Sequence, residues 1–353
     1  MKNRYLYIVV ALVLSCSNTS KMNESGWSII RANGLNGENK VFNFLFFQNK
    51  MNGIMLGYKY TDEDLLSKKF DNFNATLYCT HDGGNNWVEK GLGRGQFSSY
   101  AAKDSFIFIS KTITSLDNNK SMNDFSEVYL SKNMGRSWIE YSSFEKFYVR
   151  NMFAYSKNEI YILGKHNNES FWTLEKTIDN GLNWNKVGEL NNDLDYPTLF
   201  NDYLFYLSNS SESLLMQKSL ISGESKSIKL PNSNFKPYFI NVFNNKLYIT
   251  GVVEKQIYIY EYILKNDQYE YVTSIDEENK FPAYFYYVNN KLVLFLGERN
   301  TIGVTYSIYS KNRSSDIWDK DPIPSSYFKP YTFFENEIWG YSYESKFYRK
   351  VLD

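Results

Sequence analysis

The sequence contains few of the residues that most often carry disulfide, metal or redox chemistry. Only two cysteines, Cys16 and Cys79, and two histidines, His81 and His166, occur among 353 residues. Two cysteines cannot build a disulfide framework, and two separated histidines do not form a ligand cluster for zinc. Stability must therefore come from a packed core, and we expect neither a metal nor a cofactor.

The chain also lacks an excess of charge of either sign. It has 39 basic and 39 acidic residues, so its formal net charge is zero. A surface that binds nucleic acid normally carries an excess of Lys and Arg, so we expect no DNA or RNA partner. The acidic runs 62–64 and 193–195 lack the spacing of a calcium-binding loop, and we interpret them as solvated loops.

The first residues have the pattern of a targeting segment. Two basic residues precede the apolar run Tyr5–Leu14, which is too short to span a bilayer. Cys16 follows at the position of a lipobox, so residues 1–15 are interpreted as a lipoprotein signal peptide and Cys16 as the lipidated N-terminus. The alternative is an ordinary signal peptide with an incidental cysteine. Residues 16–25 are polar and form the expected tether, which places the protein in a bacterial cell envelope, on the periplasmic or surface side of the outer membrane.

A short apolar strand that follows a polar turn recurs along the chain. Its leading residues are Ile54, Phe106, Ile160, Leu204, Leu247, Leu292 and Ile338, at steps of 43 to 54 residues. With 31 Tyr, 26 Phe and only 7 Pro, the composition suits β-strands. The spacing predicts an all-β fold, a seven-bladed β-propeller over residues 26–353. The strand after Trp27 is expected to close the last blade and so remove exposed sheet edges.

Three segments share the pattern [Ser/Thr]-x-[Asp/Asn]-x-Gly-x-x-Trp. The residues at the Asp/Asn, Gly and Trp positions of the pattern are Asp82, Gly84 and Trp87 in the first segment, Asn133, Gly135 and Trp138 in the second, and Asp179, Gly181 and Trp184 in the third. The pattern resembles the Asp-box, or bacterial neuraminidase repeat, which forms the turn between the third and fourth strands of a propeller blade. The resemblance implies a structural role: the polar residue and Gly form the turn, and the tryptophans, together with Trp27, pack between blades.

The Asp-box family includes sialidases, which bind a carboxylate through three arginines from separate blades. The seven arginines beyond the signal segment do not match this arrangement, and the Arg-Ile-Pro-type motif of those enzymes is absent. Only Arg150, at the start of an innermost strand, is well placed to bind a ligand, and Arg94 and Arg299 are the alternatives. We therefore expect the protein not to be an enzyme.

The face opposite the box turns is the expected binding face. Tyr196, Tyr238, Tyr284 and Tyr331 flank prolines at the predicted entrances of four innermost strands, and with Arg150 they would surround one mouth of the central channel. The alternative is that these tyrosines pack between blades.

Two polar insertions, within 58–74 and 111–124, are expected as partner-binding loops on the same face. Their candidate contact residues are Asp62, Glu63, Asp64, Lys68, Lys69, Asp117 and Lys120. The alternative is sequence drift in tolerant loops. The sequence thus predicts a monomeric, non-catalytic, envelope-tethered module that captures a protein partner, as an assembly factor or an immunity protein would. The alternative function is a glycan-binding or sialidase-like propeller.

Overall fold

A computed structural model describes most of the chain from residue 26 onwards. The described residues are 26–30, 34–35, 39–63, 73–116, 122–167, 169–208, 214–288, 290–300, 303–325, 328–342 and 346–352. Cys16 and the tether residues 16–25 lie outside them. Over the described ranges, no helix has the length and apolar character needed to cross a bilayer.

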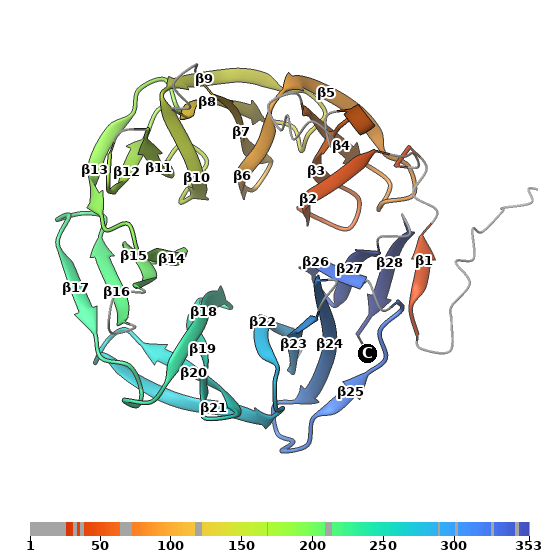
Figure 1. The fold of residues 1–353 in the computed structure, drawn as a ribbon, viewed down its shortest axis with the longest axis vertical. Coiled ribbons are helices and arrows are strands. Elements are labelled where there is room, and N and C mark those ends of the chain that lie inside the picture. The colour runs from red at the N-terminus through yellow and green to blue at the C-terminus, as the bar shows by residue number, and fades with distance from the viewer. Residues whose placement is uncertain are drawn as a thin grey trace, which may run out of the picture.

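Within the described residues, the strands form seven four-stranded antiparallel sheets arranged as a ring (Figure 1). Each sheet is given from its innermost strand outward. The first sheet contains β2 (Lys40–Phe47), β3 (Gly53–Lys59), β4 (Asn74–Thr80) and β5 (Val88–Arg94), and the second contains β6 (Gln96–Lys103), β7 (Phe106–Leu116), β8 (Met122–Ser131) and β9 (Ile139–Glu145). The third contains β10 (Phe147–Ala154), β11 (Ile160–His166), β12 (Trp172–Thr177) and β13 (Asn185–Leu190), and the fourth contains β14 (Leu194–Phe200), β15 (Tyr203–Ser208), β16 (Leu214–Ser219) and β17 (Ser225–Ile228).

The remaining sheets follow the same order. The fifth sheet contains β18 (Lys236–Phe243), β19 (Lys246–Val253), β20 (Gln256–Ile263) and β21 (Gln268–Asp276). The sixth contains β22 (Phe281–Val288), β23 (Lys291–Asn300), β24 (Gly303–Asn312) and β25 (Asp319–Asp321). The seventh contains β26 (Phe328–Phe334), β27 (Glu337–Ser342), β28 (Lys346–Val351) and, as its outermost strand, β1 (Ser28–Ile30). The predicted seven-bladed β-propeller is confirmed.

The second strand of each sheet carries most of the core. In β11, the five residues Ile160–Gly164 are all buried, whereas most of β5 is exposed. A second strand lies between two neighbouring blades, so both of its faces pack, and its sequence is continuously apolar rather than alternating. All seven predicted marker residues lie in these second strands.

Glycines near the ends of second strands make room for phenylalanine rings. A Cβ added to Gly164 would lie 2.2 Å from the ring of Phe147, and one added to Gly340 would lie 2.1 Å from the ring of Phe328. The same pairing recurs for Gly251 with Phe235 and Gly297 with Phe281. Each Phe belongs to, or directly precedes, the innermost strand of its own sheet, so the pair fixes the packing of first strand on second.

The N-terminal strand closes the ring. β1 pairs with β28, with Ser28 opposite Arg349. Trp27 is fully buried, and its indole N–H donates a hydrogen bond of 2.8 Å to the carbonyl of Pro322, which follows the last strand of the preceding blade. The first described residues therefore join the last two blades.

The three box segments form the turns between third and fourth strands, and they share one hydrogen-bond pattern. In the first, the Thr80 hydroxyl accepts from the Gly84 N–H at 2.9 Å and donates to the Asp82 carboxylate at 2.8 Å. Asp82 also accepts from the Asn86 N–H at 2.9 Å. Gly84 has a φ of 89°, which glycine adopts without strain. The segments starting at Ser131 and Thr177 repeat these bonds.

Backbone hydrogen bonds place the box turns beside the turns that join first and second strands. Gly83 N–H donates to Met51 O at 3.0 Å, Leu220 N–H to Asp202 O at 2.9 Å, and Leu352 N–H to Asn336 O at 2.7 Å. Both kinds of turn therefore lie on one side of the ring, here named the box face. The opposite side is named the loop face, because it carries the connections from second to third strands and from one blade to the next.

Candidate functional site at the loop face

Every innermost strand contains a register shift near its loop-face end. The residues within these shifts are Asn43, Ser98, Arg150, Tyr196 with Pro197, Tyr238, Ala283 and Tyr331. A β-bulge leaves its extra residue without a partner on the neighbouring strand and re-aims that side chain. Seven bulges at equivalent positions produce a ring of such residues around the axis of the propeller.

The prolines were expected at the entrances of the strands, and this expectation is wrong in detail. Pro197, Pro237, Pro282 and Pro330 lie inside their strands, within or next to the bulges. Proline is tolerated there because a bulge interrupts the hydrogen-bond ladder that the missing N–H would otherwise weaken. Three of the four predicted tyrosines are themselves bulge residues, and Tyr284 follows the bulge at Ala283.

Four side chains from neighbouring blades gather on this face, and we name them the aromatic–arginine rim: Tyr196, Tyr238, Phe281 and Arg299. Tyr196 is 52% exposed and Tyr238 is 37% exposed. The rings of Tyr238 and Phe281 stack with centroids 6.2 Å apart and planes 12° apart. The Arg299 guanidinium lies 5.7 Å from the centroid of Phe281.

Electrostatics ties Tyr196 to the same cluster. Burial raises the pKa of the Tyr196 hydroxyl, Asp195 and Tyr238 raise it further, and the positive charge of Arg299 opposes the rise. Tyr196 comes from β14, Tyr238 from β18 and Arg299 from β23. Three successive blades therefore contribute to one exposed cluster that combines aromatic faces with a cation.

A pocket of about 510 Å³ opens next to this rim, between the fifth and sixth blades along the chain. Its lining residues are Tyr238, Val252, Glu254, Lys255, Glu278, Asn279, Lys280, Phe281 and Arg299. The two lysines are already paired: Lys255 with Glu278, and Lys280 with Glu277 at 2.7 Å. Arg299 makes no ion pair with any residue that the structure describes. Among the described lining residues, this leaves the Arg299 guanidinium and the Glu254 carboxylate outside the ion pairs, with Arg299 placed over the ring of Phe281.

Arg150 was predicted as the best-placed arginine for a ligand, and the structure gives it partners within the protein. Its guanidinium forms an ion pair with Asp195 at 3.1 Å and donates a 2.7 Å hydrogen bond to the carbonyl of Leu194. It also lies 4.9 Å from the ring centroid of Trp172. Arg150 thus joins β10 to β14, and its charge is already balanced.

Tyr284 lies deeper than the rim, among other tyrosines. Burial raises the pKa of Tyr284 to about 12, with further contributions from Tyr306 and Tyr196. Burial also raises the pKa of Tyr286, and Tyr284 and Tyr100 add to this shift. Tyr100 belongs to β6, across the ring from β22 (Figure 1). The tyrosines that affect one another's pKa thus come from opposite sides of the ring.

The predicted partner-binding loops are only partly within the described residues. Asp62 and Glu63 are exposed directly after β3, while Asp64, Lys68, Lys69, Asp117 and Lys120 lie outside the description. Most of 111–124 is not a loop, because β7 and β8 continue as a paired hairpin to Leu116 and Met122. Lys111 is buried there and forms an ion pair with Glu127 at 2.7 Å. For Tyr331, only the backbone in β26 is described.

Across the described ranges, no three His, Cys, Asp or Glu residues are grouped to hold a metal ion. The acidic run at 193–195 was expected as a solvated loop, but Asp193 accepts a hydrogen bond from Ser208 and Asp195 pairs with Arg150. His166 lies in β11 rather than in a loop and packs against Phe147 at 4.8 Å.

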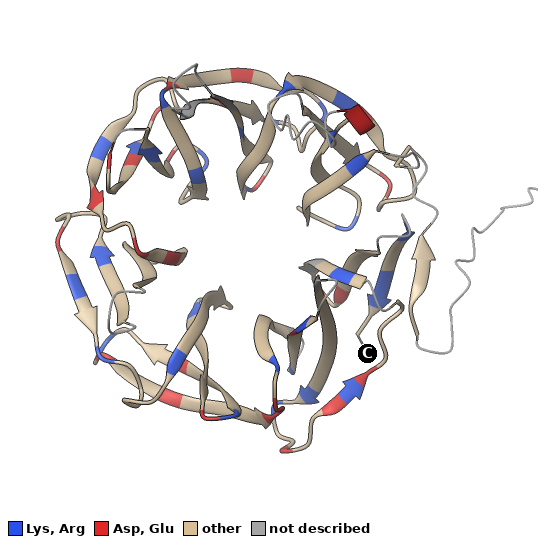
Figure 2. Cartoon of the chain, in the orientation of Figure 1, with Lys and Arg blue, Asp and Glu red and all other residues tan. Residues whose placement is uncertain are grey.

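Charge is spread evenly over the propeller. Figure 2 shows Lys and Arg interspersed with Asp and Glu around the ring, with no sector of a single sign. The charge distribution therefore provides no long-range field of one sign, and the electrostatics of the rim are set by local groups.

The comparisons with known proteins identify the fold alone. No family model matches the chain, and no curated protein sequence matches it. The β-propeller domain of the Trilobed protease from Pyrococcus furiosus matches with a TM-score of 0.57 at 10% identity, over 90% of this chain and 97% of that one. That domain is described as having an open velcro topology, whereas β1 completes the last sheet here.

Two further solved structures give the same picture. An oligogalacturonate lyase in complex with manganese matches with a TM-score of 0.57 at 10% identity, over 89% of this chain and 97% of that one. Prolyl oligopeptidase B from Galerina marginata matches with a TM-score of 0.53 at 11% identity, over 88% of this chain. The chain spans about half the length of that oligopeptidase, with 46% covered. This chain is therefore similar to the propeller domains of several different enzymes, and the shared feature is the β-propeller fold.

Proposed function

We propose that the chain is a non-catalytic binding propeller, anchored in a bacterial cell envelope through lipidated Cys16, which captures a protein partner on its loop face. The aromatic–arginine rim is the observation that carries the proposal. Tyr and Arg are the residue types that most often dominate the energetics of protein interfaces. Here Tyr196, Tyr238 and Arg299 meet from three blades, and the two tyrosines are exposed.

The pocket beside the rim suits an anchoring side chain of the partner. Arg299 presents a guanidinium over Phe281 and has no carboxylate partner among the described residues. A guanidinium binds a carboxylate in a bidentate manner, and the stacked rings add an apolar wall. We therefore expect the partner to insert an acidic residue next to an aromatic or aliphatic one. An assembly factor or an immunity protein against a secreted toxin would work in this way.

The pairing of Arg150 supports a non-catalytic role. A carboxylate site of the sialidase kind needs several arginines whose charge is open to the substrate. Arg150 is instead neutralised by Asp195 and stacked on Trp172. Arg299 lies three blades further along the chain, so these two arginines do not form a pair of substrate clamps.

Partner capture by the detergent-solubilised, lipidated chain tests the proposal. We expect Arg299→Ala and Tyr238→Ala each to weaken binding of the captured protein by at least about tenfold, as interface hot spots do. Arg313→Ala and Tyr271→Ala are matched controls, because both residues lie away from the loop-face rim, and we expect them to bind as the wild type does. Rim variants that retain wild-type affinity would overturn the proposal.

Glycan binding is the second candidate, and the observation that favours it is the size and lining of the pocket. A volume of about 510 Å³ lies in the range of small-ligand sites, and an aromatic platform beside a cation suits an acidic sugar. Titration calorimetry with sialosides and uronic-acid oligosaccharides tests it, together with an assay for turnover. If none of these compounds binds and none is hydrolysed, this candidate is removed.

A further inference from the structure

Large apolar side chains project from the turns of the box face. The exposed fraction is 64% for Ile178 and 71% for Leu182, both in the third box turn. It is 82% for Ile221, in the turn between β16 and β17, and 73% for Ile317, in the turn before β25. These turns belong to three different blades. Large apolar side chains that are this exposed, at turn tips on one side of a protein, indicate a contact surface.

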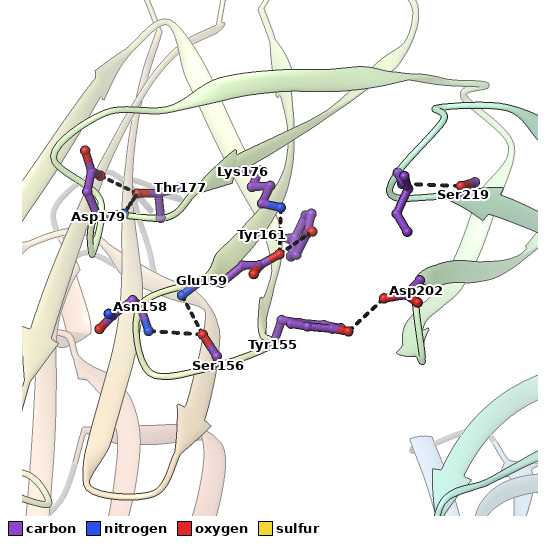
Figure 3. A network of polar contacts seen from close by, with 11 residues as sticks. Tyr155, Ser156, Asn158, Glu159, Tyr161, Lys176, Thr177, Asp179, Asp202 and Ser219 are labelled. Atoms are coloured by element: carbon purple, nitrogen blue, oxygen red, sulfur yellow. Dashed lines mark hydrogen bonds and ion pairs between the residues drawn. The ribbon is translucent and has the colours of Figure 1, made fainter.

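The carboxylate of the third box turn is satisfied within the protein. Asp179 accepts hydrogen bonds from the backbone and side chain of Asn183 and from Thr177, which lowers its pKa to about 2. Figure 3 shows the Tyr155 hydroxyl of the third blade reaching Asp202 of the fourth, and this hydrogen bond is 2.7 Å long. It joins the turns between first and second strands of these two blades, which lie on the same face as the apolar tips.

The described chain begins on this same face. β1 runs antiparallel to β28, and Ser28 lies opposite Arg349 near the end of β28. That end is held to the turn between β26 and β27 by the 2.7 Å bond from Leu352 N–H to Asn336 O. Trp27 and Gly26 therefore precede β1 at the box face. The ten residues 16–25 can span at most about 35 Å when fully extended.

We propose that the box face is a membrane-docking surface, which rests on the lipid bilayer with the tips Ile178, Leu182, Ile221 and Ile317 in the interfacial region. This inference rests on the lipidation of Cys16 in the proposed function. A short tether joined to the box face keeps that face close to the lipid. Burial of apolar side chains in the interface then favours one orientation. Because both signs of charge are interspersed over the ring, the contact depends on apolar insertion rather than on anionic lipid (Figure 2).

Depth-dependent fluorescence quenching tests the orientation. The lipidated full chain is reconstituted in vesicles of phosphatidylethanolamine and phosphatidylglycerol that contain a nitroxide-labelled lipid. An environment-sensitive dye is attached at Ile221→Cys on the box face or at Tyr238→Cys on the loop face; the native Cys79 is buried and does not compete. We expect the Ile221 label to be quenched by the lipid at least about twofold more strongly than the Tyr238 label, with blue-shifted emission.

A triple variant tests the apolar tips directly. With the dye at Ile317→Cys, the combined change Ile178→Ser, Leu182→Ser and Ile221→Ser should reduce lipid quenching. The change Tyr196→Ser with Tyr238→Ser, on the opposite face, should leave it unchanged. If the chain floats with the vesicles but both labels are quenched equally, the docking surface is refuted, whereas the lipid anchor at Cys16 is not. A chain that does not float overturns both the anchor and the docking surface. Neither result affects partner capture, which is measured on protein in detergent.

Discussion

The substitution Trp27→Ala measures how much the N-terminal strand contributes to the closed ring. The Trp27 side chain is 0% exposed, its ring packs edge-on against Phe328 at 4.8 Å, and its N–H bonds the Pro322 carbonyl at 2.8 Å. Replacing a buried Trp with Ala typically costs about 3–5 kcal/mol through lost burial and a residual cavity. The carbonyl of Pro322 also loses its partner, which places the expected loss in the upper half of this range.

Urea unfolding followed by far-ultraviolet circular dichroism is the assay. With a slope of about 3 kcal/mol per molar urea, a loss of about 4–5 kcal/mol should lower the unfolding midpoint of Trp27→Ala by about 1.3–1.7 M. Trp184→Ala is the matched control, because Trp184 also directly precedes a fourth strand but is only partly buried and donates a hydrogen bond to Ser142 at 3.2 Å. We expect a clearly smaller shift for it. A Trp27→Ala midpoint equal to that of the wild type would refute closure by β1 as a source of stability.

Three further predictions follow from particular contacts. Gly164→Ala should lower the free energy of unfolding by about 1–3 kcal/mol, because the new Cβ would lie 2.2 Å from the ring of Phe147. In thermal melting, the double variant with Phe147→Leu should recover part of this loss. The pKa of Asp179 is lowered to about 2, so its stabilisation is present above the unfolded-state pKa of about 3.9 and is lost as the pH falls towards 2. Asp179→Asn should therefore flatten the stability profile between pH 5 and 2, and an unchanged profile would contradict this. Arg150→Lys should leave partner affinity unchanged in the capture assay. A loss of affinity as large as that caused by Arg299→Ala would show that Arg150 belongs to the binding site.

The number of blades could be predicted because the strongest sequence signal coincides with the best-packed strand. Second strands such as Ile160–His166 are covered on both faces, so their sequences are continuously apolar and easily counted. Outer strands carry little signal: β17 and β25 are short and mostly exposed, and the turns that precede them have lost the box pattern. The outer strands of these blades could therefore be predicted only from their spacing relative to the strands of neighbouring blades.

The candidate site could be predicted only in part, because it depends on pairing between strands. Prolines beside Tyr196 and Tyr238 indicated the correct end of the innermost strands, but a bulge is a property of two strands in register and cannot be read from one. Arg299 could be given only as possible, and Phe281, Tyr100 and Tyr286 were not predicted as site residues, for the same reason. Their only sequence signal is their position relative to the second-strand markers.

The two arginines show how the neighbouring blade decides the role of a residue. Arg150 and Arg299 both lie towards the loop face, and the sequence favoured Arg150. Asp195, in the next blade, balances the charge of Arg150, whereas Arg299 lies over the ring of Phe281 in its own blade. The partner of Arg150 is 45 residues away in sequence. No local pattern distinguishes such a residue from one that remains open to a ligand.

The position of β1 in its sheet also sets the face on which the described chain begins. A fourth strand begins at the box face, so Gly26 and Trp27 lie on the side opposite the aromatic–arginine rim. An innermost strand such as β10 has eight residues, which places the two faces about 26 Å apart. Had the N-terminus supplied a third strand instead, Gly26 and Trp27 would lie on the same side as Tyr196 and Tyr238. Under the proposed anchoring through Cys16, closure by a fourth strand would have two effects: it completes the last blade, and it directs the rim and its pocket away from the lipid.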